Sequence, residues 1–137
     1  MSIIEITSLL IVLVPYLAVH AIIVGLLLKL RRGLPTEHRS ISRGLLVATA
    51  LPFAGPLVSS IAFSRLARCA QAATANFSAL RSDCGYAAGL AYGVIYFIAA
   101  WSRLPSLGAL SLALLVIYFW QAFAALRALR RPQLQIS

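Results

Sequence analysis

One histidine of this sequence stands inside a long apolar stretch, where a polar side chain is often functional. His20 follows Val19, and its small neighbours Ala18 and Ala21 would let a tetrapyrrole or a quinone approach it. No second histidine lies in an apolar stretch, so ligation of a haem by two membrane histidines is excluded. We therefore expect His20 to hydrogen-bond a neighbouring helix, with no cofactor bound, and contact with a tetrapyrrole or a quinone is the alternative.

The two cysteines, Cys69 and Cys84, flank one short polar connection. We expect two separate buried thiols, and the alternative, outside the cytoplasm, is a disulfide between them. Neither has a nearby cluster of histidines or acids, so the sequence predicts no metal site.

Other reactive side chains do not form a catalytic pattern. Glu37 and His38 are adjacent and could act as an acid–base pair, but we expect them to belong to a solvated polar loop instead. Ser59, Ser60 and Ser64 have no histidine nearby in the sequence. Paired carboxylates, a nucleophile elbow, a P-loop and an HExxH motif are all absent from the sequence. We therefore predict no catalytic residues and a protein that is not an enzyme.

The composition places these residues in a membrane protein. Hydrophobic residues make up 61% of the 137 residues and charged residues 11%, with a formal net charge of +9. The basic residues stand between apolar blocks, where membrane proteins use them to meet lipid headgroups. This placement argues against nucleic acid as a partner and predicts a lipid bilayer.

Four uncharged segments are each long enough to cross a hydrocarbon core of about 30 Å. The predicted fold is therefore all-α: one integral membrane domain over residues 1–137, a bundle of four membrane segments and one amphipathic interfacial helix. The segments are residues 6–28, 44–64, 84–102 and 105–126, and the amphipathic helix is residues 65–81. This helix either continues the second segment into water or lies on the lipid headgroups.

The second segment carries Pro52, Gly55 and Pro56, which bend or break a helix. We expect a kinked crossing, and the alternative is a re-entrant segment that returns to the side from which it enters. Four crossings would divide the twelve basic residues equally between the two sides. A re-entrant second segment would place eleven on one side, with Arg103 as the exception.

Three glycines, Gly85, Gly89 and Gly93, recur at four-residue spacing in the third segment. Such a glycine zipper lets another helix backbone approach closely in lipid. The partner helix could belong to this chain or to another subunit.

Two short motifs and Pro52 resemble a group of small multi-pass bacterial membrane proteins over roughly residues 34–125. The motifs are Leu34-Pro35-x-x-His38-Arg39-x-Ile41-x-x-Gly44 and Asp83-Cys84-Gly85-Tyr86-x-x-Gly89-Leu90-Ala91-Tyr92. The resemblance implies a location in the bacterial inner membrane and a membrane-embedded helical fold. It implies no activity.

These observations predict a non-catalytic accessory or scaffolding subunit of a bacterial inner-membrane complex, in contact with lipid and with other subunits or copies of itself. A small homo-oligomeric channel or transporter component is the first alternative. A subunit that contacts a tetrapyrrole or a quinone through His20 is the second.

Overall fold

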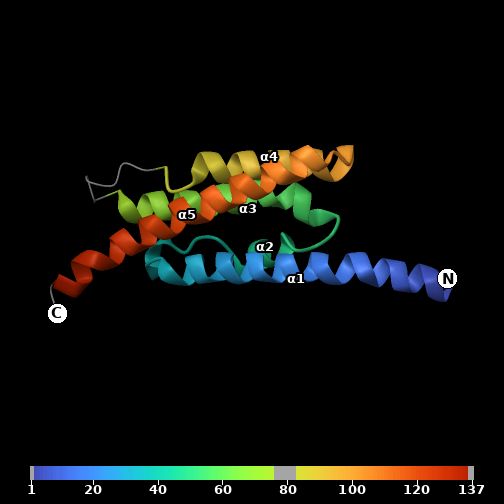
Figure 1. Ribbon diagram of the computed structural model, residues 1–137. Coiled ribbons are helices and arrows are strands. Elements are labelled where there is room, and N and C mark those ends of the chain that lie inside the picture. Colours follow the sequence, from blue (N-terminus) through green and yellow to red (C-terminus); the bar gives the residue numbers. More distant parts are fainter. Residues whose placement is uncertain (1, 76–82, 136–137) are drawn as a thin grey trace.

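The computed structural model describes residues 2–75 and 83–135, and Figure 1 shows them as helices joined by short connections. No strand occurs in these two ranges. The prediction of an all-helical protein is therefore confirmed for the described part of the chain. In chain order the elements are α1 (Ile3–Gly33), the 3-10 turn η1 (Thr36–His38), α2 (Arg43–Ala48), α3 (Ala54–Thr74), α4 (Tyr86–Ser102) and α5 (Pro105–Gln135).

Local sequence sets both ends of α1. The Ser2 hydroxyl accepts the N–H of Glu5, and the Glu5 carboxylate accepts the N–H of Ser2, which together form a capping box. At the other end the helix stops at Gly33, after which Leu34 is extended. Pro35 follows and disfavours a helical conformation for the residue before it.

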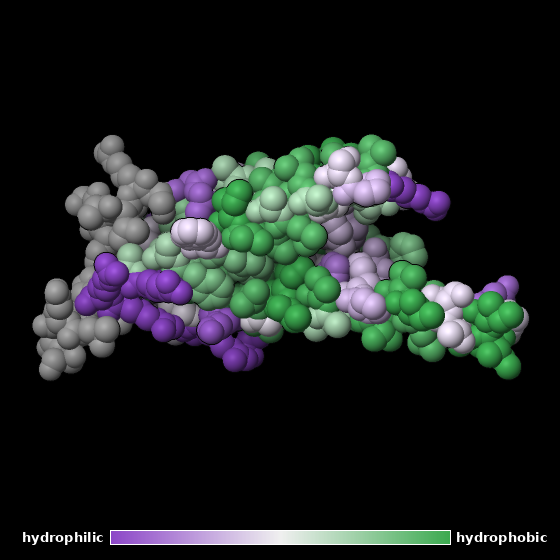
Figure 2. Space-filling model, in the orientation of Figure 1, coloured by the Kyte–Doolittle hydropathy of each residue, from purple (hydrophilic) through white to green (hydrophobic). Residues whose placement is uncertain are grey.

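Two helices are long and apolar enough to cross a membrane, by their length and composition: α1, and α5 over Pro105–Arg131. Helix α4 is a shorter apolar helix. Only 17% of the most apolar window of α1 and 33% of that of α5 is buried in the protein. Both helices therefore present most of their apolar side chains to the surroundings, and the green surface in Figure 2 follows them along the molecule.

The second predicted segment differs from a single kinked helix. The chain forms α2, a turn over residues 49–53, and then α3. Pro52 lacks the N–H that would bond to the Ala48 carbonyl, and its ring would crowd that carbonyl, so α2 ends at Ala48. Pro56 falls in the first turn of α3, where a missing N–H is tolerated.

Backbone hydrogen bonds also hold the return between α2 and α3. The N–H of Leu51 donates to the Ala48 carbonyl at 3.2 Å, and the N–H of Gly55 donates to the Leu51 carbonyl at 2.7 Å. A Cβ at Gly55 would overlap the Thr49 carbonyl oxygen, so this tight return requires glycine. The result is a helical hairpin in which α3 runs antiparallel to α2 (Figure 1).

The structure has no helix boundary at residue 65, so the first part of the predicted amphipathic helix continues the second segment, which is one of its two expected placements. Helix α3 continues unbroken to Thr74 because its apolar side continues too: Leu66, Ala67 and Ala70 are buried, while Arg65 and Arg68 are exposed. The remainder of the predicted amphipathic helix, residues 76–81, lies outside the described residues.

Helices α3, α4 and α5 pack around an aromatic core. The Phe63 ring of α3 lies 4.8 Å from the Tyr92 ring of α4 and 4.7 Å from the Tyr118 ring of α5, measured between centroids. Phe63 and Tyr118 are fully buried. Helix α1 lies beside this three-helix unit, with α2 packed against both α1 and α3 (Figure 1).

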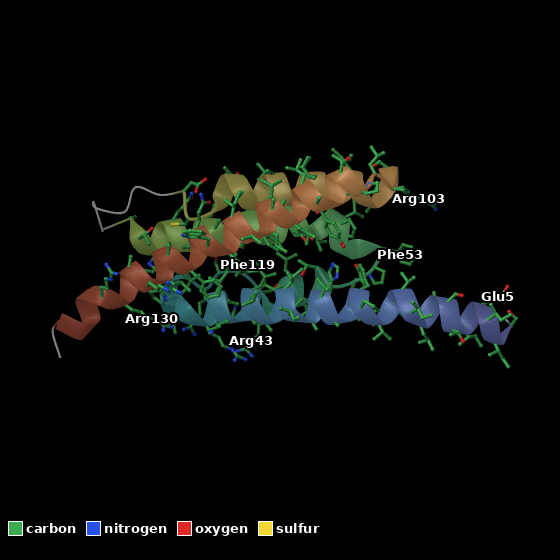
Figure 3. The ribbon with its side chains drawn as sticks, in the orientation of Figure 1. Glu5, Arg43, Phe53, Arg103, Phe119 and Arg130 are labelled. Atoms are coloured by element: carbon green, nitrogen blue, oxygen red, sulfur yellow. The ribbon has the colours of Figure 1, made fainter. Side chains whose placement is uncertain are left out.

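The described basic residues gather at one end of the molecule, and Arg103 is the exception. Arg43 and Arg130 lie at this end in Figure 3, and Arg103 lies at the other end with Glu5 and Phe53. The hairpin causes this asymmetry because it returns α3 to the end where α2 begins. An equal division of charge, expected for four crossings, is therefore wrong for the described residues.

Candidate functional site

His20, the buried polar residue of α1, forms a small hydrogen-bonded cluster with two tyrosines. The His20 Nε2 atom lies 3.0 Å from the Tyr96 hydroxyl of α4, and Nδ1 lies 2.8 Å from the Tyr16 carbonyl oxygen one turn earlier. The hydroxyls of Tyr16 and Tyr96 are 3.3 Å apart. The cluster therefore joins α1 to α4 through side chains.

The geometry assigns the protons of this cluster. A carbonyl oxygen can only accept, so Nδ1 carries the proton and donates to Tyr16. In a neutral imidazole Nε2 is then an acceptor, and the Tyr96 hydroxyl donates to it. The Tyr16 hydroxyl in turn donates to the Tyr96 oxygen. His20 is 8% exposed and its ring stacks on that of Tyr16 at 4.0 Å between centroids.

This arrangement bears on what His20 could bind. A metal or haem iron needs a ring nitrogen with a free lone pair, and Tyr96 occupies the lone pair of Nε2. An iron ligand would have to displace the tyrosine. The residues present therefore fit a hydrogen-bonded helix contact better than an axial ligand, and a quinone would have to compete for the same donors.

The sequence identifies His20 but not its partners. Tyr96 is 76 residues away, and no local pattern connects the two. The available signal was the run of Tyr92 and Tyr96 one turn apart in the third segment, which places two aromatic hydroxyls on one side of that helix.

Cys69 and Cys84 are both present as buried thiols. The Cys69 sulfur lies 3.3 Å from the Ser40 hydroxyl, and the Cys84 sulfur lies 3.6 Å from the Thr74 hydroxyl. Cys84 has a positive φ of 52°, in the turn that leads into α4. A disulfide between Cys69 and Cys84 outside the cytoplasm stays an untested alternative.

Glu37 and His38 line a pocket of about 400 Å³ at the basic end. Their side chains are 3.6 Å apart, and the Glu37 side chain is 77% exposed. Arg65, Arg68 and Cys69 from α3 form the facing wall. The open setting and the two guanidinium groups suit an anion better than acid–base chemistry.

Gly85 at the N-cap of α4, and Gly89 and Gly93 within α4, all face other helices of this chain. A Cβ at Gly93 would overlap the Ser60 backbone of α3, and a Cβ at Gly89 would lie 2.9 Å from the Tyr118 ring. Gly85 has a φ of +85° and faces Tyr118 as well. These contacts place the glycine face of α4 against α3 and α5.

Asp83 sets the start of α4. Its carboxylate accepts the N–H groups of Gly85 and Ala87, each at 3.0 Å. These are donors that a helix N-terminus otherwise leaves without partners.

Within residues 2–75 and 83–135, no group of three or more histidine, cysteine or acidic side chains could hold a metal ion. The sequence matches no family model, no curated protein and no solved structure.

Proposed function

We propose that this chain is a non-catalytic accessory or scaffolding subunit of an assembly in the bacterial inner membrane. In this proposal α1, α4 and α5 cross the bilayer, and α2 and α3 form a hairpin that enters and leaves at the basic end. That end faces the cytoplasm, because Lys and Arg are enriched in cytoplasmic loops. The inner-membrane location rests on the resemblance of the two sequence motifs to small multi-pass proteins of that membrane.

The burial of α3 supports the hairpin. Irregular backbone at membrane depth is tolerated only where protein covers it. Eleven of the 21 residues of α3 are buried, including polar Ser59 and Thr74, whose hydroxyls donate to backbone carbonyls one turn earlier. In the turn over residues 49–53, the N–H groups of Ala50 and Leu51 donate to backbone carbonyls of α2, and the Leu51 carbonyl accepts the N–H of Gly55.

The accessory role rests on one observation, the uncovered N-terminal half of α1. Before His20 no residue of α1 is buried, and Val12 is 71% exposed. The buried residues of α1 are His20, Ile23, Leu27 and Leu30, and the contact of Tyr16 with Tyr96 lies one turn before them. A helix that is tied down over its second half and free over its first presents a long apolar surface to another membrane helix.

The alternatives use other features. A homo-oligomeric channel or transporter component would bring the same α1 surfaces of several copies together. A subunit that contacts a tetrapyrrole or a quinone would use His20, but both its ring nitrogens already have partners. The accessory role requires no rearrangement of that cluster.

Photo-crosslinking in cells tests the proposal. A photoreactive amino acid at Val12 should capture one discrete protein, which mass spectrometry after purification in mild detergent should find in a stoichiometric amount. The matched control is Val116 of α5, which is 64% exposed and also valine. We expect no protein to be captured at Val116.

Each outcome has a meaning. Capture of a second copy of this chain at Val12, with flux through liposomes, would replace the accessory role by the channel alternative. Capture of lipid alone at both positions, with no stoichiometric partner, would contradict the proposal.

A further inference from the structure

Two neighbouring hollows of about 190 and 370 Å³ lie along α5 and share Phe123 and Arg127 in their walls. Together they are called the groove. The first hollow lies between α1 and α5, and the second continues along α5 toward its N-terminal half. The first is lined by Lys29, Phe123, Leu126, Arg127 and Arg130, and the second by Val116, Phe119, Trp120, Phe123, Ala124 and Arg127.

The first hollow is strongly cationic. Lys29 from α1 faces Arg127 and Arg130 from α5, and no acid lines the hollow. None of these three side chains has a hydrogen bond or an ion pair within the described residues. Other cations at the same end are committed to the fold: Arg31 donates to the Ile41 carbonyl, and Arg39 donates to the Leu34 carbonyl. The first hollow therefore holds three positive charges that no described residue compensates.

The second hollow is apolar and aromatic. Phe119, Phe123 and Trp120 line it below Arg127, and Trp120 is 76% exposed. From Arg127 to Val116 is eleven residues, which is about 16 Å along a helix. A ligand that fills both hollows must therefore be anionic at one end and apolar over a considerable length.

We propose that this groove binds one anionic phospholipid, with its phosphate held by Lys29, Arg127 and Arg130 and an acyl chain along Phe123, Phe119 and Val116. Basic pockets between membrane helices on the cytoplasmic side bind anionic headgroups in this manner. Free phosphate could use only the first hollow. The inference rests on the membrane placement proposed above and not on the accessory role.

The lipid would also join two helices that touch each other little. Helices α1 and α5 meet near Gly33, where a Cβ would come within 2.8 Å of the Leu126 side chain. Away from this point Lys29 and the arginines of α5 only repel each other. A phosphate between them replaces that repulsion with attraction, so the bound lipid should hold α1 against the three-helix unit.

The test is a binding and stability measurement on the purified full chain in mild non-ionic detergent. Native mass spectrometry should show one phosphatidylglycerol retained per chain, and added phosphatidylglycerol should raise the melting temperature by several degrees. Phosphatidylcholine and glycerol phosphate should do neither. Equal retention of phosphatidylcholine, or an equal shift with glycerol phosphate, would overturn the proposal.

Single-charge variants locate the site. Arg127→Gln should weaken phosphatidylglycerol binding about fivefold, from the usual contribution of one cation near an anionic membrane surface. Arg43→Gln is the matched control, because Arg43 is exposed at the same end and lies outside the groove (Figure 3). Equal weakening by the two changes would mean diffuse attraction to the basic end and would overturn the site.

A third variant tests the acyl chain. Phe123→Ala removes no charge, yet it should reduce phosphatidylglycerol retention while leaving any weak binding of glycerol phosphate unchanged. Unchanged retention would contradict the apolar half of the site. Failure of the accessory role is distinguishable, because a chain that retains the lipid but captures no protein at Val12 would contradict only that role.

Discussion

The contact between α3 and α4 gives the sharpest quantitative prediction. In Gly93→Ala the new methyl group would overlap the Ser60 backbone, and backbone cannot move aside as the end of a flexible side chain can. Overpacking of this kind costs about 1–3 kcal/mol, and the backbone obstacle places Gly93 at the upper end of that range. Alanine recovers about 1 kcal/mol of helix propensity. The net expectation is a free energy of unfolding lower by about 2 kcal/mol.

Reversible unfolding in mixed micelles, followed by circular dichroism as the denaturing detergent is increased, measures this loss. Gly25→Ala and Gly108→Ala are the matched controls, because a Cβ at either position meets no atom within 4 Å. Both should leave the stability unchanged or raise it slightly. The packing argument is refuted if Gly93→Ala is as stable as the wild type, or if the controls lose as much as it does.

Three further predictions follow from the fold. A reporter fused after Ser137 should be active in the cytoplasm, and activity on the outer side would contradict the placement of the basic end inside. Tyr96→Phe should lower the free energy of unfolding by about 1 kcal/mol, because it removes the donor to His20. Tyr92→Phe should have little effect, because the Tyr92 hydroxyl has no partner in the described residues. Equal losses of stability in the two variants would argue against the cluster. Asp83→Ala should cost about 1 kcal/mol through loss of the cap on α4, and a variant of unchanged stability would show that the cap contributes nothing.

Local chemistry made much of this fold predictable from the sequence. The uncharged runs correspond to helices α1, α4 and α5, and Gly33, Pro35 and Pro105 stand at their ends. The small residues of the third segment indicated close helix packing, which the structure places between α4 and its neighbours α3 and α5. Each of these features depends on residues within a turn or two of one another.

Features that depend on distant contacts were less predictable. Pro52 signals a bend, but whether a chain continues across or turns back depends on which helices cover α3, and no local pattern encodes that. The extension of α3 beyond residue 65 depends on burial of Leu66 and Ala70 against other helices. The pairing of His20 with Tyr96 joins residues from two helices that are separate in the sequence.

The charge asymmetry of the folded chain has a consequence for how it enters the bilayer. The turn between α4 and α5 contains Arg103 as its lone charge, whereas both ends of the α2–α3 hairpin stay at the basic end. In the proposed orientation, insertion of the α4–α5 pair transfers one guanidinium group through the hydrocarbon, and insertion of the hairpin transfers none. Placing a second basic residue in the α4–α5 turn would therefore double the charge that must be translocated. Membrane insertion should become slower, while the stability of the folded chain should change little.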